Sequence, residues 1–390
     1  MLRVLTLSTL FPDASRPNFG VFVERQTLGL AAHPNVDLRV VAPLGVPPWP
    51  LSRHGHYAPL AALPEREVWK GLDTLRPRFR TWPGTAGRFH AGALVRRLIP
   101  LLTALRCEFR FDVIDAEFFF PDGPAAVALG RHFGVPVSIK ARGADIHHWG
   151  GAPATAAQVI AAGQAADGLL AVSQAMRADM AALGLAESRI RVHHTGVDLD
   201  RFGPRDRVTA KAAYGVAGPL IVSLGALIPR KGHDLVVSTM ASLPGATLLI
   251  AGEGPARGAL TAQIAALGLA DRVRLLGSVP HGDLPALLGA ADVMALASAS
   301  EGLANAWVEA LACGTPIVIT GAGGAAEVVT ERAVGRIVNR TAPAFAEAIG
   351  AVLADPPSAQ QVRRGAARFT WAANTAALYD HLSGLVSTRR

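Results

Sequence analysis

The sequence predicts an α/β protein with two doubly wound, Rossmann-like domains, each built on a parallel sheet. Three observations predict this fold class. Apolar runs of strand length alternate with helix-like segments, each run is continuous in Val, Ile and Leu, and the series of runs begins twice along the chain. Continuous apolar runs are typical of strands that are covered on both faces, as in a parallel sheet with helices on each side.

The first set of expected strands occupies the N-terminal half of the chain. The apolar run from Val4 to Phe11 is short for the core of a secretory leader, and Pro12-Asp13 follows it instead of a cleavage site of small residues. It is therefore interpreted as a buried first strand. The strands expected in this half are residues 3–8, 37–42, 113–116, 136–140, 168–172 and 190–193.

The second set begins after the polar segment 198–217, where we expect the domain boundary. Its strands are residues 219–224, 246–251, 273–276, 293–296 and 316–320. The predicted domains are residues 1–200 and 201–365, with a C-terminal helix in residues 366–390 packing back on the first domain. Two doubly wound domains that face each other would form a ligand cleft between the carboxyl ends of their strands.

The composition is that of a folded protein without a spanning helix. Half of the residues are apolar, 17% are charged, and no stretch of 18 apolar residues occurs. Cys107 and Cys313 fit no metal or CxxC spacing, which indicates a reducing, cytoplasmic location. The net charge of +8 favours anionic partners, whether phosphates, nucleic acid or anionic lipid.

The most informative stretch is residues 298–316. Glu301 lies in a small-residue loop after an expected strand, and Asn305 is a candidate N-cap for a helix from Ala306 to about Cys313, which contains Glu309. Carboxylates in this position can accept hydrogen bonds from sugar hydroxyls. The alternative is a capped helix with two solvated glutamates.

Backbone amides in the same stretch favour an anionic ligand. Gly302, Leu303 and Ala304 precede the expected helix, and amides at a helix N-terminus attract phosphate. A second stretch points the same way, because Arg230-Lys231 lies between Pro229 and Gly232 at an expected strand-to-helix turn. Two adjacent cations there suit a diphosphate, and the alternative is a solvated basic turn.

At these residues the chain resembles the retaining glycosyltransferases of family 4, which have the two-domain GT-B fold. Glu301 and Glu309, in the frame EGLANAWVEALACGTPIV, resemble the family's E-x7-E signature. The resemblance covers nearly the whole chain and is strongest in the second half. Its other motifs are Gly225-x4-Arg230-Lys231-Gly232, Ala251-Gly252-Glu253-Gly254-Pro255, Leu276-Gly277-Ser278-Val279-Pro280, His194-Thr195-Gly196-Val197-Asp198 with Phe202, and Gly323-Gly324-x-x-Glu327.

The resemblance implies a role for each matching residue. Glu309 would bind the ribose and Glu301 the hydroxyls of the transferred sugar. Arg230 and Lys231 would neutralise the diphosphate as charge builds on the leaving group. The nucleobase of the donor would lie near Val279.

Further donor contacts follow from the same resemblance. The amides of Gly302, Leu303 and Ala304 would bind phosphate or sugar, and Gly20, in the glycine loop after the first strand, would let backbone approach the phosphate. The N-terminal domain would then bind the acceptor and the C-terminal domain the donor. The donor, a UDP- or GDP-sugar, is a substrate, so no cofactor is implied.

The resemblance also implies a metal-independent transfer with retention. The leaving phosphate would take the proton from the acceptor hydroxyl, so no carboxylate base is required, unlike in glycosidases. Asp198-Leu199-Asp200 looks like a DxD metal motif, but it lies in the linker segment. His147-His148 is interpreted as a polar loop, because adjacent residues rarely both face one ion.

The first half departs from the family pattern. Asp115 and Glu117 stand where the family often has histidines, and Arg142 stands where it often has a histidine before glycine. The resemblance therefore assigns no catalytic histidine at these positions. We expect Glu117, Arg142 and Asp145 on the acceptor side, and the alternative is a structural ion pair between Glu117 and Arg142.

Residues 66–110 carry most of the excess positive charge. Ten basic residues and three acidic ones occur there, with five Trp and Phe residues interleaved. This pattern predicts peripheral contact with the anionic inner face of the plasma membrane. The pattern also suits nucleic acid, which is the less favoured partner. The alternative without a partner is a solvated basic loop and helix.

The predicted activity is transfer of a hexose-type sugar from a nucleotide-sugar to a lipid-linked or oligosaccharide acceptor, in surface polysaccharide or glycolipid synthesis. Two alternatives belong to other classes. One is a catalytically silent, nucleotide-sugar-binding partner subunit of another transferase. The other is a GT-B-like sugar-nucleotide epimerase.

Overall fold

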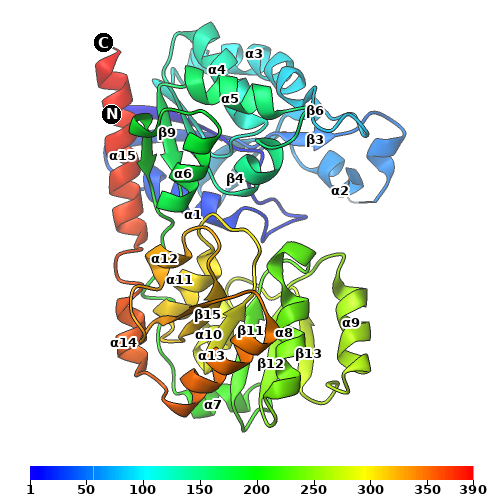
Figure 1. Cartoon of the computed structure of the whole chain (residues 1–390). Helices are drawn as coiled ribbons and strands as arrows, with labels where there is room; N and C mark the ends of the chain where they lie inside the picture. The colour runs from blue at the N-terminus through cyan, green and yellow to red at the C-terminus, as the bar shows by residue number, and fades with distance from the viewer. Residues whose placement is uncertain (56, 390) are drawn as a thin grey trace. The chain divides into compact units, whose positions relative to one another are not determined.

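A computed structural model describes residues 1–55 and 57–389 (Figure 1). The chain divides into two compact units. Unit 1 consists of Met1–Thr195 together with Trp371–Arg390, and unit 2 consists of Gly196–Thr370. The C-terminal segment thus returns to the N-terminal unit.

Unit 1 is built on a sheet of eight strands in the described part of the chain, in the order β10-β9-β8-β7-β1-β2-β5-β4. All neighbours in this sheet are parallel except β4 and β5. A separate parallel pair joins β3 (Leu44–Val46) and β6 (Arg78–Arg80). The strands of the large sheet are β1 (Leu2–Leu7), β2 (Val36–Val41), β4 (Arg66–Trp69), β5 (Leu72–Leu75), β7 (Val113–Ala116), β8 (Val137–Ala141), β9 (Gly168–Ala171) and β10 (Ile190–Val192).

The helices of unit 1 include the C-terminal one. Leu378 and Leu382 of this helix share a buried cluster with Val23 and Leu30 of α1. The His381 ring is 3.0 Å from Ser138 Oγ. The helix is therefore fastened by apolar and polar contacts. The helices are α1 (Val21–Ala31), α2 (Tyr57–Ala62), α3 (His90–Glu108), α4 (Asp122–Phe133), α5 (Ala156–Ala165), α6 (Gln174–Ala182) and α15 (Trp371–Thr388).

Unit 2 is built on a parallel sheet in the order β13-β12-β11-β14-β15-β16. Its strands are β11 (Leu220–Leu224), β12 (Thr247–Ala251), β13 (Val273–Gly277), β14 (Val293–Leu296), β15 (Ile317–Thr320) and β16 (Gly335–Val338). Its helices are α7 (Arg207–Ala212), α8 (His233–Thr239), α9 (Arg257–Ala266), α10 (Leu284–Ala290), α11 (Asn305–Ala312), α12 (Ala325–Val328), α13 (Ala342–Ala354) and α14 (Ala359–Arg364).

The predicted fold class, two doubly wound parallel-sheet domains, is confirmed. Strands β14 and β15 are buried along their whole length, as their continuous apolar sequences predict. Short strands were missed, namely β3, β4, β5, β6 and β16, because they are brief and carry glycine or charged residues. Within the described residues, no helix is both long and apolar enough to cross a membrane.

Each sheet has a point at which the strand order reverses. In unit 2 the chain moves outward from β11 to β13 on one side and from β14 to β16 on the other. In unit 1 the corresponding neighbours are β1 and β7. Ligands of open α/β sheets bind outside the carboxyl ends of strands at such a point. The loops after these four strands are therefore the places to search for a site.

Candidate functional site

The reversal point of unit 2 brings three of the predicted catalytic residues together. Arg230 and Lys231 lie in a short 3-10 helix, η4 (Pro229–Lys231), after β11, and Glu301 lies in the loop after β14. Lys231 Nζ donates to Glu301 Oε1 at 2.6 Å, and Arg230 Nη1 is 3.7 Å from Glu301 Oε2. The side chain of Lys231 is 15% exposed and that of Arg230 is 40% exposed. Both cations can therefore reach a ligand.

The turn that carries the cations is locked by backbone contacts. Gly232 has a φ of 67°, and a Cβ atom there would lie 2.1 Å from the carbonyl oxygen of Ala297. The amide of Ala299 donates to the carbonyl of Arg230 at 2.8 Å. A side chain at position 232 would separate the turn from the loop that carries Glu301, which explains the glycine.

Helix α11 begins one residue earlier than the sequence predicts. The predicted N-cap, Asn305, is the first helical residue, and the N-cap position is held by Ala304, which has no side-chain oxygen to cap the helix. Asn305 was therefore wrong as the N-cap, and Gly302, Leu303 and Ala304 do precede the helix. Such one-residue differences are common at helix ends.

The loop of Glu301 is shaped by a second glycine contact. A Cβ atom at Gly323 would lie 2.2 Å from the carbonyl oxygen of Glu301, and the amide of Gly324 donates to the carbonyl of Gly302 at 2.8 Å. Ser298 Oγ donates to Glu301 Oε1 at 2.6 Å. The carboxylate is thus aimed by its own loop and by Lys231.

Glu309 has a different partner. It lies within α11 and is buried, with Oε1 placed 2.8 Å from Nε2 of His281. The His281 ring also packs 5.5 Å from the Phe202 ring, between centroids. His281 was not predicted as a site residue. Its place directly after the Leu276–Pro280 motif is the signal that could have found it.

The loops at the carboxyl ends of β11, β12 and β13 are joined through backbone. A Cβ atom at Gly252 would lie 1.8 Å from the carbonyl oxygen of Gly225. The amide of Gly252 also donates to Gly277 at 2.8 Å. Val279, the predicted neighbour of the base, is half-buried in the loop after β13. The glycines thus set the distance between these three loops.

Positive charge in this region comes from arginine and lysine. Burial, followed by the nearby charge of Lys231, lowers the pKa of His233 to about 4, so its ring is neutral near pH 7. Arg340 adds a cation that was not predicted. Its guanidinium donates to Ala297 at 2.8 Å and to Pro229 at 3.3 Å. Arg340 thereby ties η4 to the loop after β14.

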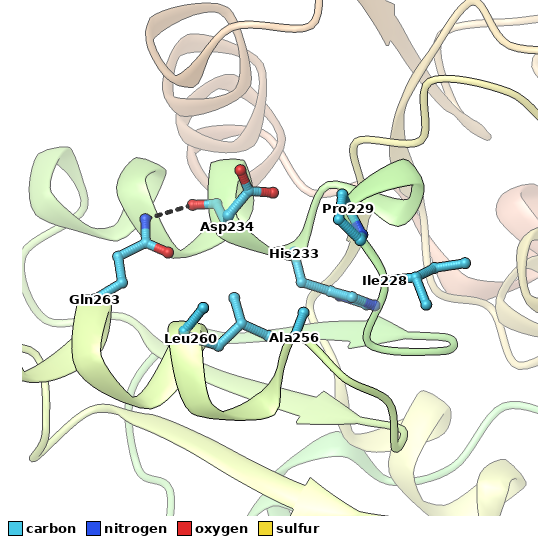
Figure 2. Close-up of a pocket in the computed structure, with 8 residues that line it drawn as sticks. Ile228, Pro229, His233, Asp234, Ala256, Leu260 and Gln263 are labelled. Carbon is cyan, nitrogen blue, oxygen red and sulfur yellow. Dashed lines mark hydrogen bonds between the residues drawn. The ribbon is translucent and has the colours of Figure 1, made fainter.

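A pocket of about 170 Å³ lies beside the cationic turn, between α8 and α9 (Figure 2). Its walls are mostly apolar, and its polar lining residues are His233, Asp234 and Gln263. The side-chain amide of Gln263 donates to the backbone carbonyl of Asp234 at 2.8 Å. Lys231 and Glu301 do not line it. An apolar wall offers nothing to a diphosphate, so we keep the candidate site at the ionic contact and not in this pocket. The lining residues are Ile228, Pro229, His233, Asp234, Ala256, Ala259, Leu260 and Gln263.

The reversal point of unit 1 contains the predicted glycine loop. Gly20 has a φ of 70° and is the N-cap of α1. A Cβ atom there would lie 2.4 Å from the carbonyl oxygen of Leu10. Glycine is therefore required both by backbone conformation and by the close packing of the loop.

Glu117 and Arg142 form an ion pair in unit 1. Arg142 Nη2 contacts Glu117 Oε2, and the side chains are 5% and 0% exposed. Arg142 Nε also donates to the Glu117 carbonyl at 2.8 Å. Gln26 bonds to the same carboxylate, and Lys140 Nζ donates to Gln26 Oε1 at 2.5 Å. The ion-pair alternative describes this arrangement.

Asp145 accepts hydrogen bonds from the backbone of its own turn and of the loop after β7. Its carboxylate accepts hydrogen bonds from the amides of Phe119 at 2.9 Å, Arg142 at 3.0 Å and Gly143 at 2.7 Å. Burial raises its pKa. These bonds fix the turn after β8, and the side chain is buried rather than presented to solvent.

The two metal-like motifs have other contacts. Asp198 Oδ1 accepts from the amides of Asp200 and Arg201, each at 3.1 Å, which is a turn contact. His147 Nε2 lies 2.8 Å from Asp179 Oδ2. Among the described residues, no three or more His, Cys, Asp or Glu side chains gather in a way that would hold a metal ion.

Many cations of residues 66–110 are already engaged. Arg66 pairs with Asp73 at 2.8 Å and Arg97 with Glu65 at 3.4 Å. Arg76 is buried and contacts Glu67. The stretch is therefore not one continuous free basic surface.

Two family models match the chain in tandem. The model described as Glycosyltransferase Family 4 matches residues 29–201, and the one described as Glycosyl transferases group 1 matches residues 207–369. Proteins called D-inositol 3-phosphate glycosyltransferase, from Mycobacterium tuberculosis and Mycobacterium bovis, are 37% identical over 210 residues. That match covers 50% of this chain and 44% of the relative, so the chain matches less than half of the relative's length.

Solved structures share the fold at low sequence identity. Sucrose-phosphate synthase from Thermosynechococcus elongatus has a TM-score of 0.84 at 20% identity and full coverage of both chains. Anabaena Alr3699/HepE in complex with UDP-glucose has a TM-score of 0.73 at 21% identity, covering 98% of this chain and 100% of that one. At such identities the likeness is evidence for the fold.

Proposed function

Because the chain belongs to glycosyltransferase family 4, we propose that it transfers a sugar from a nucleotide-diphosphate sugar to a hydroxyl of an acceptor. The observation that carries this proposal is the 2.6 Å contact between Lys231 Nζ and Glu301 Oε1 at the reversal point of unit 2. This contact places a cation that can bind phosphate beside a carboxylate that can accept hydrogen bonds from sugar hydroxyls. A donor sugar diphosphate offers both groups to such a pair.

The donor is held from its two ends in this proposal. Arg230 and Lys231 bind the diphosphate, and Glu301 binds hydroxyls of the sugar. Glu309 binds the ribose, and His281, 2.8 Å from its carboxylate, fixes its orientation. The nucleobase of the donor lies against the backbone near Val279. The UDP-glucose complex of the similarly folded HepE supports a uridine donor as the first to test.

We also assign donor contacts to one backbone element in each unit, considered separately. The amides of Gly302, Leu303 and Ala304 lie at the start of α11, where the helix dipole favours negative charge. Gly20 is the N-cap of α1, at the positive end of that helix. We assign both elements to phosphate or sugar contacts.

The transfer step needs charge stabilisation more than an added base. The bond between the sugar C1 and the leaving diphosphate breaks while a bond from the acceptor oxygen to C1 forms on the same face. The acceptor proton passes to the leaving phosphate. Arg230 and Lys231 stabilise the negative charge that develops on that phosphate, so we propose retention without a metal or cofactor.

For the acceptor we propose a lipid-linked or oligosaccharide hydroxyl, as in surface polysaccharide or glycolipid synthesis, on the cytoplasmic side of a membrane. Free Cys107 and Cys313 support a reducing location. Glu117, Arg142 and Asp145 would shape the acceptor side from behind, since all three are buried or nearly so. The mycobacterial relatives make a polyol phosphate the second acceptor to test.

Nucleotide release from a panel of UDP- and GDP-sugars, with and without these acceptors, tests the proposal. We expect Lys231→Ala to lower kcat roughly 100- to 1,000-fold, the usual loss when a donor to developing charge is removed. The matched control is Lys211→Ala, because Lys211 is also 15% exposed and pairs with Asp292 at 2.5 Å in the same unit. It should leave kcat unchanged.

Each other outcome favours a different function. Equal turnover by Lys231→Ala and wild type would show that the Lys231–Glu301 contact has no role in the transfer. Tight donor binding without release under any acceptor would indicate the silent partner subunit. A free sugar nucleotide altered at C2 would indicate the epimerase.

A further inference from the structure

A small lobe of unit 1 lies outside the main sheet. It comprises residues 43–55, 57–64 and 77–89, with β3, β6, α2 and a 3-10 turn at Leu51–Arg53. β3 and β6 pair in parallel, with Leu44 opposite Arg78 and Val46 opposite Arg80. Figure 1 shows β3, β6 and α2 together at the edge of unit 1. We call these residues the β3–β6 lobe.

The β3–β6 lobe has its own small core. Leu44, Val46 and Leu60 are buried together, and Leu63 packs against them. The Arg78 guanidinium donates to the carbonyl of Ala61 at 3.3 Å, which joins α2 to β6. These inward residues hold the lobe together, so the apolar residues left on its outside are not needed for that core.

Four large apolar side chains lie on the outside of the lobe. Trp49 is 74% exposed, Phe89 51%, Leu51 46% and Trp82 45%. An exposed apolar group of this kind is typical of an interaction surface. Tryptophan in particular suits the boundary between water and lipid, because its ring is apolar and its N–H is polar.

The two tryptophans lie in the loops that follow the carboxyl ends of β3 and β6. Trp49 lies shortly after Val46 and Trp82 shortly after Arg80, and the two strands run parallel. The amide of Thr81 donates to the carbonyl of Val46 at 3.1 Å, which keeps the two exit loops adjacent. The tryptophans therefore extend from neighbouring loops.

Prolines stiffen both loops. Pro47, Pro48 and Pro50 surround Trp49, and Pro83 follows Trp82. Proline fixes φ and reduces the backbone freedom lost when a loop is held against a surface. The exposed rings are thus presented at low entropic cost.

The charge of the lobe is of one sign. No Asp or Glu occurs in residues 38–64 or in residues 74–107. Arg53, Arg80 and Arg88 are exposed, and within the described residues none of them pairs with a carboxylate. This differs from Arg66 and Arg97, which are paired. The lobe therefore combines exposed apolar rings with unneutralised arginines.

We propose that the β3–β6 lobe docks on an anionic lipid bilayer. The rings of Trp49, Trp82 and Phe89 and the side chain of Leu51 enter the interfacial layer, and the arginines bind lipid phosphates. A nucleic acid fits less well, because Leu51 cannot stack on a base and the apolar group is large for a backbone-tracking groove. The proposal deepens the proposed function, since a lipid-linked acceptor would lie in such a bilayer, and it narrows the membrane surface expected at residues 66–110.

Vesicle flotation of the full chain tests the docking. Wild type should float with phosphatidylcholine vesicles that contain phosphatidylglycerol, and much less with phosphatidylcholine alone. Arg53→Glu with Arg80→Glu should weaken binding roughly 30-fold or more, because each arginine near an anionic surface contributes on the order of a fivefold factor. The matched control, Arg332→Glu with Arg364→Glu, makes the same charge change at exposed positions of unit 2 and should bind like wild type.

The apolar part is tested separately. Trp49→Ala with Trp82→Ala should weaken binding roughly 10-fold or more at both low and high salt, since ring insertion is not screened by ions. Val208→Ala, at a 79% exposed apolar position of unit 2, should have no effect. An unfolding midpoint equal to that of wild type would show that each variant is folded.

Three results would overturn the proposal. They are absence of wild-type flotation with anionic vesicles, equal flotation of wild type and the double tryptophan variant, and binding to a single-stranded oligonucleotide in preference to vesicles. Nucleotide release with a water-soluble acceptor separates this proposal from the proposed function. Flotation without any release would support the docking surface while the transferase proposal fails.

Discussion

Both units bring charged side chains together in the loops that follow two neighbouring parallel strands, but they expose them to different degrees. In unit 2, Lys231 and Glu301 meet beside Arg230, which is 40% exposed. In unit 1, Glu117 and Arg142 meet with 0% and 5% exposure. Adjacent strand ends therefore bring the charges together in each unit, and burial decides what they can do. Accessible cations can bind a ligand, whereas a sealed pair can hold neighbouring backbone in place.

The sealed pair belongs to a wider buried network. Lys140 Nζ lies 2.6 Å from His193 Nδ1, and burial lowers the pKa of Lys140 to about 7. Burial, followed by the charge of Glu117, raises the pKa of Asp115 well above its usual range. The His193 ring reaches the carbonyl of Asn374 in α15 at 2.9 Å. The buried network therefore extends from the Glu117–Arg142 pair to the C-terminal helix.

Removing one member of the sealed pair is the largest expected effect. We expect Arg142→Ala to lower the free energy of unfolding by about 3–5 kcal/mol, because it leaves Glu117 buried without its cation. Denaturant unfolding followed by circular dichroism measures this. Arg66→Ala is the control, since Arg66 is 53% exposed in its pair with Asp73, and it should cost less than about 1 kcal/mol.

The double variant Arg142→Ala with Glu117→Gln checks the cause. If the cost arises from an unpaired buried carboxylate, neutralising that carboxylate should recover part of the lost stability. Equal costs for Arg142→Ala and Arg66→Ala would mean that the pair is open to water. The acceptor-side interpretation of Glu117 and Arg142 would then gain support.

The sequence predicted the local features of this comparison better than the long-range ones. Continuous apolar runs located strands such as β14 and β15, and the motif spacing identified Glu301 and Lys231, whose contact depends on two adjacent strands. The burial of Glu117 depends on side chains from α1, β8 and the loop that follows β8. No local pattern encodes such packing.

The site residues that were missed have the same physical origin. His281 and Arg340 act through partners 28 and more than 40 positions away, at Glu309 and Ala297. A histidine after a strand or an arginine before a helix is common, so neither residue type stands out by itself. Their relevance follows from the sheet order, which brings the loops together.

Glycine contacts provide a second way to test the accessible site. We expect Gly232→Ala to lower the free energy of unfolding by about 2–4 kcal/mol, through a strained positive φ and a clash with the Ala297 carbonyl. Turnover should fall as well, because the clash moves η4 away from Glu301. Thermal unfolding and nucleotide release measure the two effects.

Gly268→Ala is the matched control for this substitution. Gly268 has a φ of 64°, close to the 67° of Gly232, but a Cβ atom there would meet nothing within 4 Å. It should cost about 1 kcal/mol, the strain of the left-handed conformation, and leave turnover unchanged. Equal costs at positions 232 and 268 would show that the turn does not depend on the close contact with Ala297.

The last expected effect is a pH dependence that arises from a single buried carboxyl of unit 1. Asp122 accepts a hydrogen bond from the Thr9 amide at 2.8 Å, and burial raises its pKa from 3.8 to about 8. Between these pH values the folded state holds a proton that the unfolded state has lost. The free energy of unfolding therefore falls as pH rises through this window, by at most about 1.4 kcal/mol per pH unit for one proton.

Asp122→Asn should remove this slope, because the amide stays neutral and its oxygen can still accept from Thr9. The stability of the variant relative to wild type should then rise steadily between pH 5 and about pH 8, as measured by urea unfolding at several pH values. Asp73→Asn is the control. Its hydrogen bond with Arg66 lowers the pKa of Asp73, so that carboxyl is ionised in both states across the same window and the difference from wild type should stay flat. A flat difference for Asp122→Asn would mean that Asp122 is ionised in the folded state, and the contrast between a sealed unit 1 cluster and an accessible unit 2 cluster would not extend to this position.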